Sequence, residues 1–229
     1  MARTIVGTAA LASEVLPEGY SESRSQVIRI FQAGVGWLGS SIVLALPVIL
    51  EQARMKADWR ELSLLFPLIS RILNTIPESR AGMAELLQEM LPSLLSRSFA
   101  VLPPDTSAYF PDRVDLMTAT FRMLQVAVTQ HPLLSLTLVS GELPVLKELL
   151  AMLLVALRSS KLTRKPASVF LRRLHDLWFA GGLPPPPSPS TSDGNTQRIA
   201  RLQGMEVLKN FIEVDLNPEE RALVGSAVR

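Results

Sequence analysis

The sequence predicts an all-α protein built from stacked helical hairpins. Four times a large apolar residue precedes a proline and further apolar residues, at 46–49, 66–69, 91–95 and 143–146. Each stretch has helical periodicity, and proline is tolerated in the first turn of a helix and kinks a helix elsewhere. No alternating strand pattern longer than a few residues occurs. Recurrent prolines at helix starts or kinks, with no strand between them, are typical of helical hairpins that stack.

Composition narrows the class of protein. The chain has 229 residues, of which 48% are hydrophobic and 19% charged, and its mean hydropathy is +0.26. These values suit one domain or one repeat array and exclude disorder over most of the length. The net charge of +2 is too small to drive non-specific nucleic-acid binding. A secretory signal is not expected, because Glu14 closely follows the short apolar stretch 4–12.

Four helices are expected in the first half of the chain. Residues 1–21 form a loosely ordered lead-in, with turn signals at 17–19. Apolar residues at 62, 65, 66, 69, 72 and 73 have the spacing of one helix face. The predicted helices are Ser23–Trp37, Ser41–Met55, Leu62–Thr75 and Arg80–Phe99, the last kinked at Pro92.

Three more helices follow the loop Leu102–Pro111. The stretch Leu149–Leu157 is nine consecutive apolar residues, so its helix must be buried on most sides. Gly181-Gly182 closes the last of the three, as expected of a C-terminal stop. The predicted helices are Asp112–Thr129, Pro144–Arg158 and Ala167–Ala180, with a short apolar segment at Leu133–Ser140.

A linker divides these helices from the C-terminal part. Residues 183–196 are polyproline followed by small polar residues that cannot form a core. An amphipathic helix, Gln197–Val214, and a short helix after Asn217-Pro218 complete the chain. The expected organisation is therefore a lead-in (1–21), a helical-repeat domain (22–182), the linker (183–196) and a C-terminal part (197–229). The stripe that should dock the amphipathic helix consists of Ile199, Leu202, Met205, Leu208, Phe211 and Ile212.

The stretch Thr129–Leu150 resembles an armadillo-type repeat. His131-Pro132 stands where the first helix of such a repeat ends, Ser140-Gly141 where the second ends, and Leu143-Pro144-Val145-Leu146 where the third begins. The match is at the level of the HEAT/armadillo superfamily. Similar irregular, proline-punctuated, leucine-rich helices occur in karyopherins and scaffold nucleoporins. The resemblance implies an irregular helical-hairpin array, either a right-handed α-solenoid or a compact helical bundle.

Residues Gly34–Gly39 match the dinucleotide fingerprint G-x-G-x-x-G. That chemistry needs a strand before the glycines, a helix N-terminus at the pyrophosphate and an acidic residue about 20 positions on. Asp58 has the right distance, but the residues before it are not strand-like. We therefore expect a glycine-rich turn between two close-packed helices, where Gly36→Ala should lower stability. An NAD(P)-dependent oxidoreductase is the third-ranked alternative.

The same region suggests a membrane segment. Ile30–Leu50 has no charged residue across 21 positions, which is long enough for a bilayer. Three glycines, two serines, Gln32 and Pro47 argue against a span, and a hairpin with Ser40 or Ser41 as N-cap explains them better. A membrane-associated helical protein, anchored through 30–50, is the second-ranked alternative.

Residues for catalysis or for metal binding do not cluster in the sequence. The chain has no cysteine, which excludes disulfides and zinc thiolates and is compatible with the cytoplasm or the nucleus. His131 and His175 are the only histidines, and His175 and its neighbour Asp176 point to different helix faces. Glu85 and Glu89 share a face, as surface carboxylates commonly do. We predict no catalytic, cofactor or metal site.

One charge bias stands out between the last helices of the repeat domain. It either marks a solvated loop at the end of the 144–158 helix, where cations are favoured, or a patch for an acidic peptide, a phospholipid headgroup or an RNA backbone. Only Phe170 interleaves it, so sequence-specific RNA recognition is not expected. The six positive residues, with no acidic residue between them, are Arg158, Lys161, Arg164, Lys165, Arg172 and Arg173.

The sequence therefore predicts an intracellular, non-enzymatic scaffold, cytoplasmic or nuclear. It binds protein partners that carry an acidic or amphipathic-helical segment, through the six positive residues. The predicted core comprises Leu65, Ile69, Leu73, Leu87, Phe121, Leu124, Leu149, Leu150, Leu153 and Leu157.

Overall fold

The computed structural model describes residues 21–77, 80–105, 110–140, 145–185 and 192–224. Over these residues the chain is helical and contains no strand, which confirms the all-α class. Two of the elements that the structure describes in full are not α-helical: the 3-10 helix η1 (Gly39–Leu44) and the π-helix η3 (Phe211–Asp215). The α-helices are α2 (Ser21–Leu38), α3 (Leu46–Lys56), α4 (Trp59–Thr75), α5 (Arg80–Ala100), α6 (Phe110–Gln130), α7 (Leu134–Thr137), α8 (Val145–Arg158), α9 (Lys161–Phe179), α10 (Ser192–Asn210) and α11 (Pro218–Val224).

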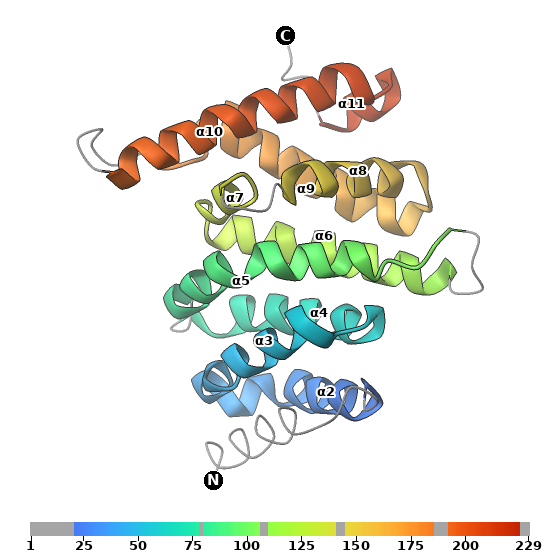
Figure 1. Cartoon of the computed structure of the whole chain (residues 1–229), viewed down its shortest axis with the longest axis vertical. Helices are drawn as coiled ribbons and strands as arrows, with labels where there is room; N and C mark the ends of the chain where they lie inside the picture. Colours follow the sequence, from blue (N-terminus) through green and yellow to red (C-terminus); the bar gives the residue numbers. More distant parts are fainter. Residues whose placement is uncertain (1–20, 78–79, 106–109, 141–144, 186–191, 225–229) are drawn as a thin grey trace.

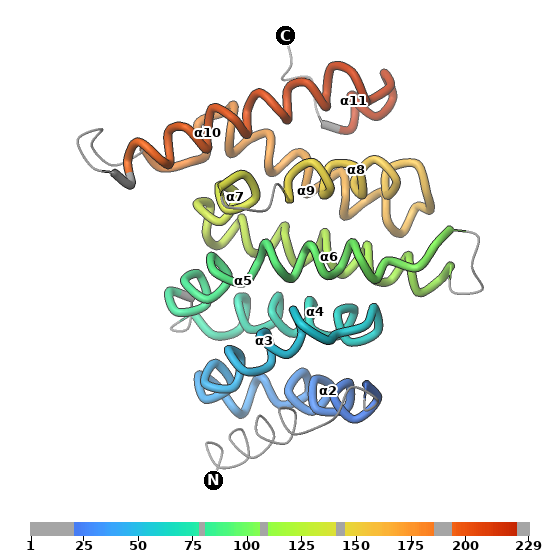
Figure 2. Tube along the Cα trace, viewed as in Figure 1, coloured from blue at the N-terminus to red at the C-terminus, as the bar shows by residue number. Residues whose placement is uncertain are grey.

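The helices lie in two rows along the long axis of the molecule (Figures 1 and 2). One row consists of α2, α4, α6 and α9, each in contact with the next. The other contains α3, α5 and α8, again in contact in that order, with α7 beside α5. At the C-terminal end, α10 packs on α7 and α9, and α11 packs on α9. The chain thus crosses between the rows as it advances along the stack.

A single hydrophobic cluster runs between the rows. Phe121 of α6 and Phe170 of α9 join two neighbours of the first row, with ring centroids 5.9 Å apart. The ten residues that the sequence predicts to be in the core are all buried, which confirms that prediction. Within Leu149–Leu157, Ala151 is exposed and Leu154 and Val155 are half-buried, so one narrow face of α8 remains open.

Two helices begin earlier than predicted because polar residues cap them. Asp58 accepts from the Glu61 N–H at 2.9 Å and Glu61 accepts from the Asp58 N–H at 3.1 Å, a capping box that starts α4 at Trp59 and not at Leu62. Ser160 likewise caps α9, which begins at Lys161 and not at Ala167. Pro166 therefore lies inside α9, as Pro67 and Pro92 lie inside α4 and α5.

The glycine-rich region differs from the prediction of a turn. Gly34 and Gly36 lie within α2, and only Gly39, with φ +55°, sits where the α-helix ends. The predicted helix Ser41–Met55 is divided into η1 and α3. Neither Ser40 nor Ser41 caps α3, because its N-cap is Ala45 and Pro47 is its second residue.

The boundaries around the linker also move. The helix α10 begins at Ser192, so residues 192–196 are helix and not linker. Gly181, with φ +78°, follows the end of α9 as predicted. Elsewhere, the predicted loop Leu102–Pro111 ends earlier than expected, since α6 already begins at Phe110. The lead-in (1–20), the repeat positions 141–144 and the linker residues 186–191 lie outside the described residues.

The amphipathic helix docks through a face that is only partly the predicted one. Leu208, Phe211 and Ile212 are buried as expected, whereas Ile199 and Leu202 are 48% and 66% exposed. Ala200 and Gly204 face inward in the central part of α10. A Cβ at Gly204 would lie 2.8 Å from Trp178 Cη2 of α9, so the missing side chain permits this close approach.

Candidate functional site

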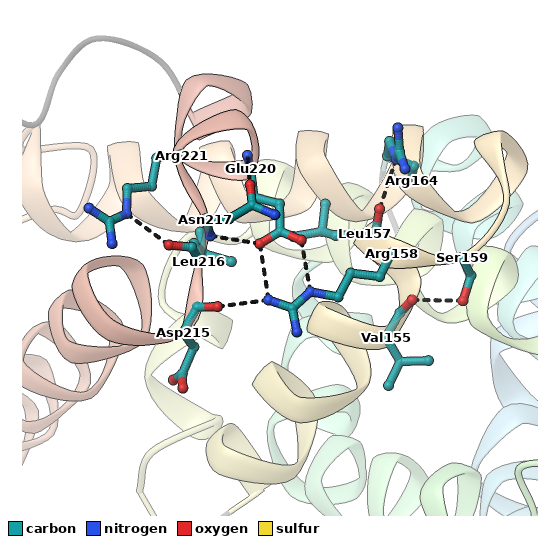
Figure 3. A network of polar contacts seen from close by, with 10 residues as sticks. All are labelled: Val155, Leu157, Arg158, Ser159, Arg164, Asp215, Leu216, Asn217, Glu220 and Arg221. Atoms are coloured by element: carbon teal, nitrogen blue, oxygen red, sulfur yellow. Dashed lines mark hydrogen bonds and ion pairs between the residues drawn. The ribbon is translucent and has the colours of Figure 1, made fainter.

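The six predicted cationic residues lie on two consecutive helices. Arg158 is the last residue of α8, and the other five belong to α9. Lys161 and Lys165 are exposed, while Arg173 is half-buried. Arg158, Arg164 and Arg172 are also exposed, but the side chain of each donates a hydrogen bond to another part of the chain, as Figure 3 shows for Arg158 and Arg164.

Arg158 bonds to the first turn of α11 and to the segment that leads into this helix. Its Nε donates to Glu220 Oε1 at 2.9 Å and its Nη2 to Glu220 Oε2 at 3.3 Å. The same Nη2 donates to the carbonyl oxygen of Asp215 at 2.9 Å. Paired hydrogen bonds between guanidinium and carboxylate are directional and stronger than neutral ones. Arg158 also stands at the C-terminal end of α8, where the helix dipole favours a cation.

Glu220 is held on two sides. Its N–H donates to Asn217 Oδ1 at 2.9 Å and its Oε2 accepts from the Asn217 N–H at 2.9 Å, so the two residues form the capping box of α11. The Glu220 side chain is only 8% exposed. The hydrogen bond from Arg158 lowers the pKa of Glu220 below its ordinary value, supported by the Asn217 N–H and opposed by burial. The same bond raises the pKa of Arg158.

Further arginines bond to backbone carbonyls around this pair. Arg172 Nη2 donates to the Leu223 carbonyl of α11 at 2.7 Å. Arg164 Nε donates to the Leu157 carbonyl at 2.8 Å, in the last turn of α8. From the other side, Arg221 Nε donates to the Leu216 carbonyl at 2.9 Å. The arginines of α8 and α9 thus serve in part to attach the C-terminal segment.

A groove between α8 and α10 was not predicted. It has a volume of about 470 Å³ and a floor that is mostly apolar. Lys147, Glu206 and Asp215 carry the charges around it. The sequence signal for it was weak, since Ala151 and Leu154 belong to the same apolar run as the buried residues of α8. The remaining lining residues are Leu150, Ala151, Leu154, Val207, Asn210 and Phe211.

The residues considered for catalysis and metal binding are not brought together. His131 follows the last residue of α6. His175 is buried in α9, where its ring stacks on Phe179 with centroids 5.0 Å apart. His175 Nδ1 is 3.7 Å from Asp176 Oδ1, longer than a hydrogen bond. Among the residues that the structure describes, no three of His, Cys, Asp or Glu are grouped to hold a metal.

The glycine fingerprint does not have the geometry that a dinucleotide requires. Gly34 and Gly36 lie within the helix α2, and in the described chain no strand precedes them. A helical interior leaves no free backbone N–H groups to hold a pyrophosphate. We therefore do not propose nucleotide binding.

The helix α2 and the 3-10 helix η1 expose several large apolar side chains. Over the described residues, one stretch, Ser21–Leu44, is long and apolar enough to cross a membrane, and a third of its most apolar window is buried. The core helix of a soluble protein meets the same criterion. Ile30, Trp37 and Leu44 are 56%, 62% and 66% exposed, whereas Ile42, Leu46 and Leu50 are buried.

Comparisons of the chain with known protein families, with curated proteins and with solved structures give no match.

Proposed function

We propose that the protein is a non-enzymatic interaction scaffold, an irregular α-solenoid of the HEAT/armadillo type. The observation that carries the proposal is the pair of helix rows, α2–α4–α6–α9 and α3–α5–α8, between which the chain alternates. Stacked helical hairpins of this kind expose long surfaces on which other proteins bind. The karyopherin- or nucleoporin-like role and the cytoplasmic or nuclear location belong to this proposal.

The groove between α8 and α10 favours a partner that binds as a helix. Its floor includes Leu150, Leu154 and Phe211, and its charges are Lys147, Glu206 and Asp215. An apolar floor with charged edges fits an amphipathic helix, which lays its apolar face into such a groove. The exposed Lys161 and Lys165 on α9 favour acidic character in the same partner, since charge complementarity steers association.

The test is affinity purification of the full chain followed by mass spectrometry, with one variant and one matched control. Ala151→Glu places a charge in the groove at an exposed position of α8, and Ala33→Glu makes the same change at an exposed position of α2. We expect specific partners that are lost with Ala151→Glu and kept with Ala33→Glu. Equal partner sets from both variants would show that the groove does not bind them.

Membrane association through Ile30–Leu50 is the second candidate. The observation in its favour is the outer face of α2, where the apolar Ile30, Ala33 and Trp37 are exposed at the spacing of one helix side. Burial of Ile42, Leu46 and Leu50 argues against insertion of the whole segment. In vesicle flotation, membrane binding should be lost with Ala33→Glu and kept with Ala151→Glu, the reverse of the result expected for the scaffold.

A further inference from the structure

We propose that α11 occupies a protein-binding surface of this chain, and that the partner segment which replaces it is an acidic helix with the same capping pattern. The surface, called here the arginine surface, is formed by Arg158 of α8 and Arg172 of α9. The inference rests on the proposed scaffold function and names the chemistry of the partner.

The two arginines contact the two ends of α11. Arg158 bonds the carboxylate of Glu220 in its first turn, and Arg172 bonds the carbonyl of Leu223 in its last turn. The distance in sequence is large, 62 residues for the first contact and 51 for the second. An arginine at each end of one short helix selects a carboxylate near the helix start and free carbonyls at the helix end. A capped acidic helix has both of these features, and α11 is one such helix.

The hold on α11 combines polar bonds with a few apolar contacts, since Leu216, just before the helix, is buried in the hydrophobic cluster and Leu223 packs against that cluster. Within 217–223, Glu220 is the one buried residue and Leu223 is half-buried. A helix of 7 residues is marginal on its own. The ion pair between Arg158 and Glu220 is also weakened by salt, because the Arg158 side chain is half exposed. The attachment of α11 is therefore suited to exchange with a segment of similar chemistry.

A partner helix needs three features to take this place. It needs Asn, Asp, Ser or Thr at the N-cap, a glutamate three residues later to reach Arg158, and an accessible last turn for Arg172. In α11 these positions are held by Asn217, Glu220 and Leu223. Because α11 is tethered to the chain, it competes at high effective concentration and reduces the apparent affinity for a free helix.

The test uses the full chain and a fluorescent peptide with the sequence of residues 215–224, DLNPEERALV. Three chains are compared by fluorescence anisotropy at low salt: the wild type, Glu220→Gln and Glu219→Gln. The first variant removes the charge that bonds Arg158, and the second changes the exposed neighbouring glutamate. We expect Glu220→Gln to bind the peptide about tenfold more tightly than the other two chains, because a larger fraction of its arginine surface is open. A peptide with Gln in place of Glu220 should lose that gain, and so should the chain Arg158→Gln/Glu220→Gln.

Hydrogen exchange of residues 217–224 shows whether Glu220→Gln releases α11, and thermal unfolding shows that the rest of the chain stays folded. Faster exchange in Glu220→Gln alone supports the proposal, and unchanged exchange overturns it. Equal peptide affinity of all three chains, absence of binding by Glu220→Gln, or equal affinity for the Gln peptide also overturns it. The scaffold function fails by a different measurement, the comparison of Ala151→Glu with Ala33→Glu, so the two failures are distinguishable.

Discussion

Gly204 of α10 lies against the indole of Trp178 on α9. A Cβ at Gly204 would stand 2.8 Å from Trp178 Cη2, 3.0 Å from Cζ3 and 3.1 Å from Val139 Cγ2. Trp178 is buried, and its Nε1 donates to Ser135 Oγ of α7 at 3.1 Å, so the ring has a fixed position. The contact brings α10 onto both α7 and α9, and it depends on the absence of a side chain.

Gly204→Ala should therefore lower the free energy of unfolding. Alanine favours a helix over glycine by up to about 1 kcal/mol, but overpacking a fixed site costs roughly 1–3 kcal/mol, so we expect a net loss of about 1 kcal/mol. The matched control is Gly36→Ala in α2, where nothing lies within 4 Å of the added Cβ. It should stabilise by about 0.5–1 kcal/mol, opposite to the expectation from sequence alone. Urea unfolding measures both, and a gain with Gly204→Ala would contradict the close contact.

Leu153→Ala tests the buried side of α8. Leu153 is fully buried, and truncating such a leucine costs about 2–5 kcal/mol, because apolar contacts are lost and a cavity remains. Leu162→Ala is the control, since Leu162 of α9 is 68% exposed and should change stability by less than about 0.5 kcal/mol. Chemical denaturation of both variants gives the comparison. Similar effects of the two changes would mean that α8 is not packed as described.

The pair Arg158–Glu220 predicts a pH dependence for the attachment of α11. Because the hydrogen bond from Arg158 lowers the pKa of Glu220 in the folded chain, the pair contributes fully above the ordinary glutamate pKa. The contribution is lost as the pH falls through the lowered pKa of the folded state. The protection of residues 217–224, measured as exchange rates corrected for the intrinsic pH dependence of amide exchange, should fall on acidification from about pH 7 to about pH 3, and Glu220→Gln should remove most of this change. A wild type and variant with the same pH profile would show that Glu220 does not hold α11.

Two charge reversals separate partner attraction from folding. Lys161→Glu/Lys165→Glu changes exposed residues, so stability should shift by less than about 0.5 kcal/mol, while association with acidic partners becomes slower. Arg158→Glu/Arg172→Glu removes the hydrogen bonds to Glu220 and Leu223, so it should release α11. Surface plasmon resonance with a captured partner and hydrogen exchange distinguish the two effects. Unchanged association with the lysine pair would make those lysines an ordinary solvated face.

Local patterns predicted most helices and the core, because both follow from apolar periodicity within one segment. The predicted starts of α4 and α9 were wrong because Asp58 and Ser160 cap these helices. The caps lie before the apolar residues of α4 and before the proline of α9 on which the predictions depended. The prediction of which face of α10 points inward was half wrong. Gly204 lets α10 approach Trp178 closely because it has no side chain, and a search for a hydrophobic stripe does not detect such a residue.

The candidate site shows the same limit. The cationic residues were visible as a charge bias in sequence, but their acidic partner was not, since Glu220 lies 62 residues from Arg158. The segment Asn217-Pro218-Glu219-Glu220 was correctly predicted as a helix start. Which side chain its glutamate would meet depends on how α11 packs against α9, and that contact is set by the tertiary fold.

The C-terminal helix α10 is attached to the stack by buried apolar side chains. Leu208 of α10, together with Phe211 and Ile212 of η3, is buried against the core, and Ala200 is buried earlier in α10. A specific protease site inserted between Ser190 and Thr191 would divide the chain without changing these contacts. After cleavage the two pieces should remain together on gel filtration, because the separated helix would expose its apolar side chains to water.

The control for this cleavage is the same chain with Leu208→Asp and Phe211→Asp. Burying an unpaired carboxylate is costly, so these changes should let the pieces separate after cleavage. If the chain with native Leu208 and Phe211 also separates, α10 is not held by its buried face. In that case the C-terminal segment would be a recognition element that detaches from the stack, and Arg158 and Arg172 would be open to other acidic helices without any exchange.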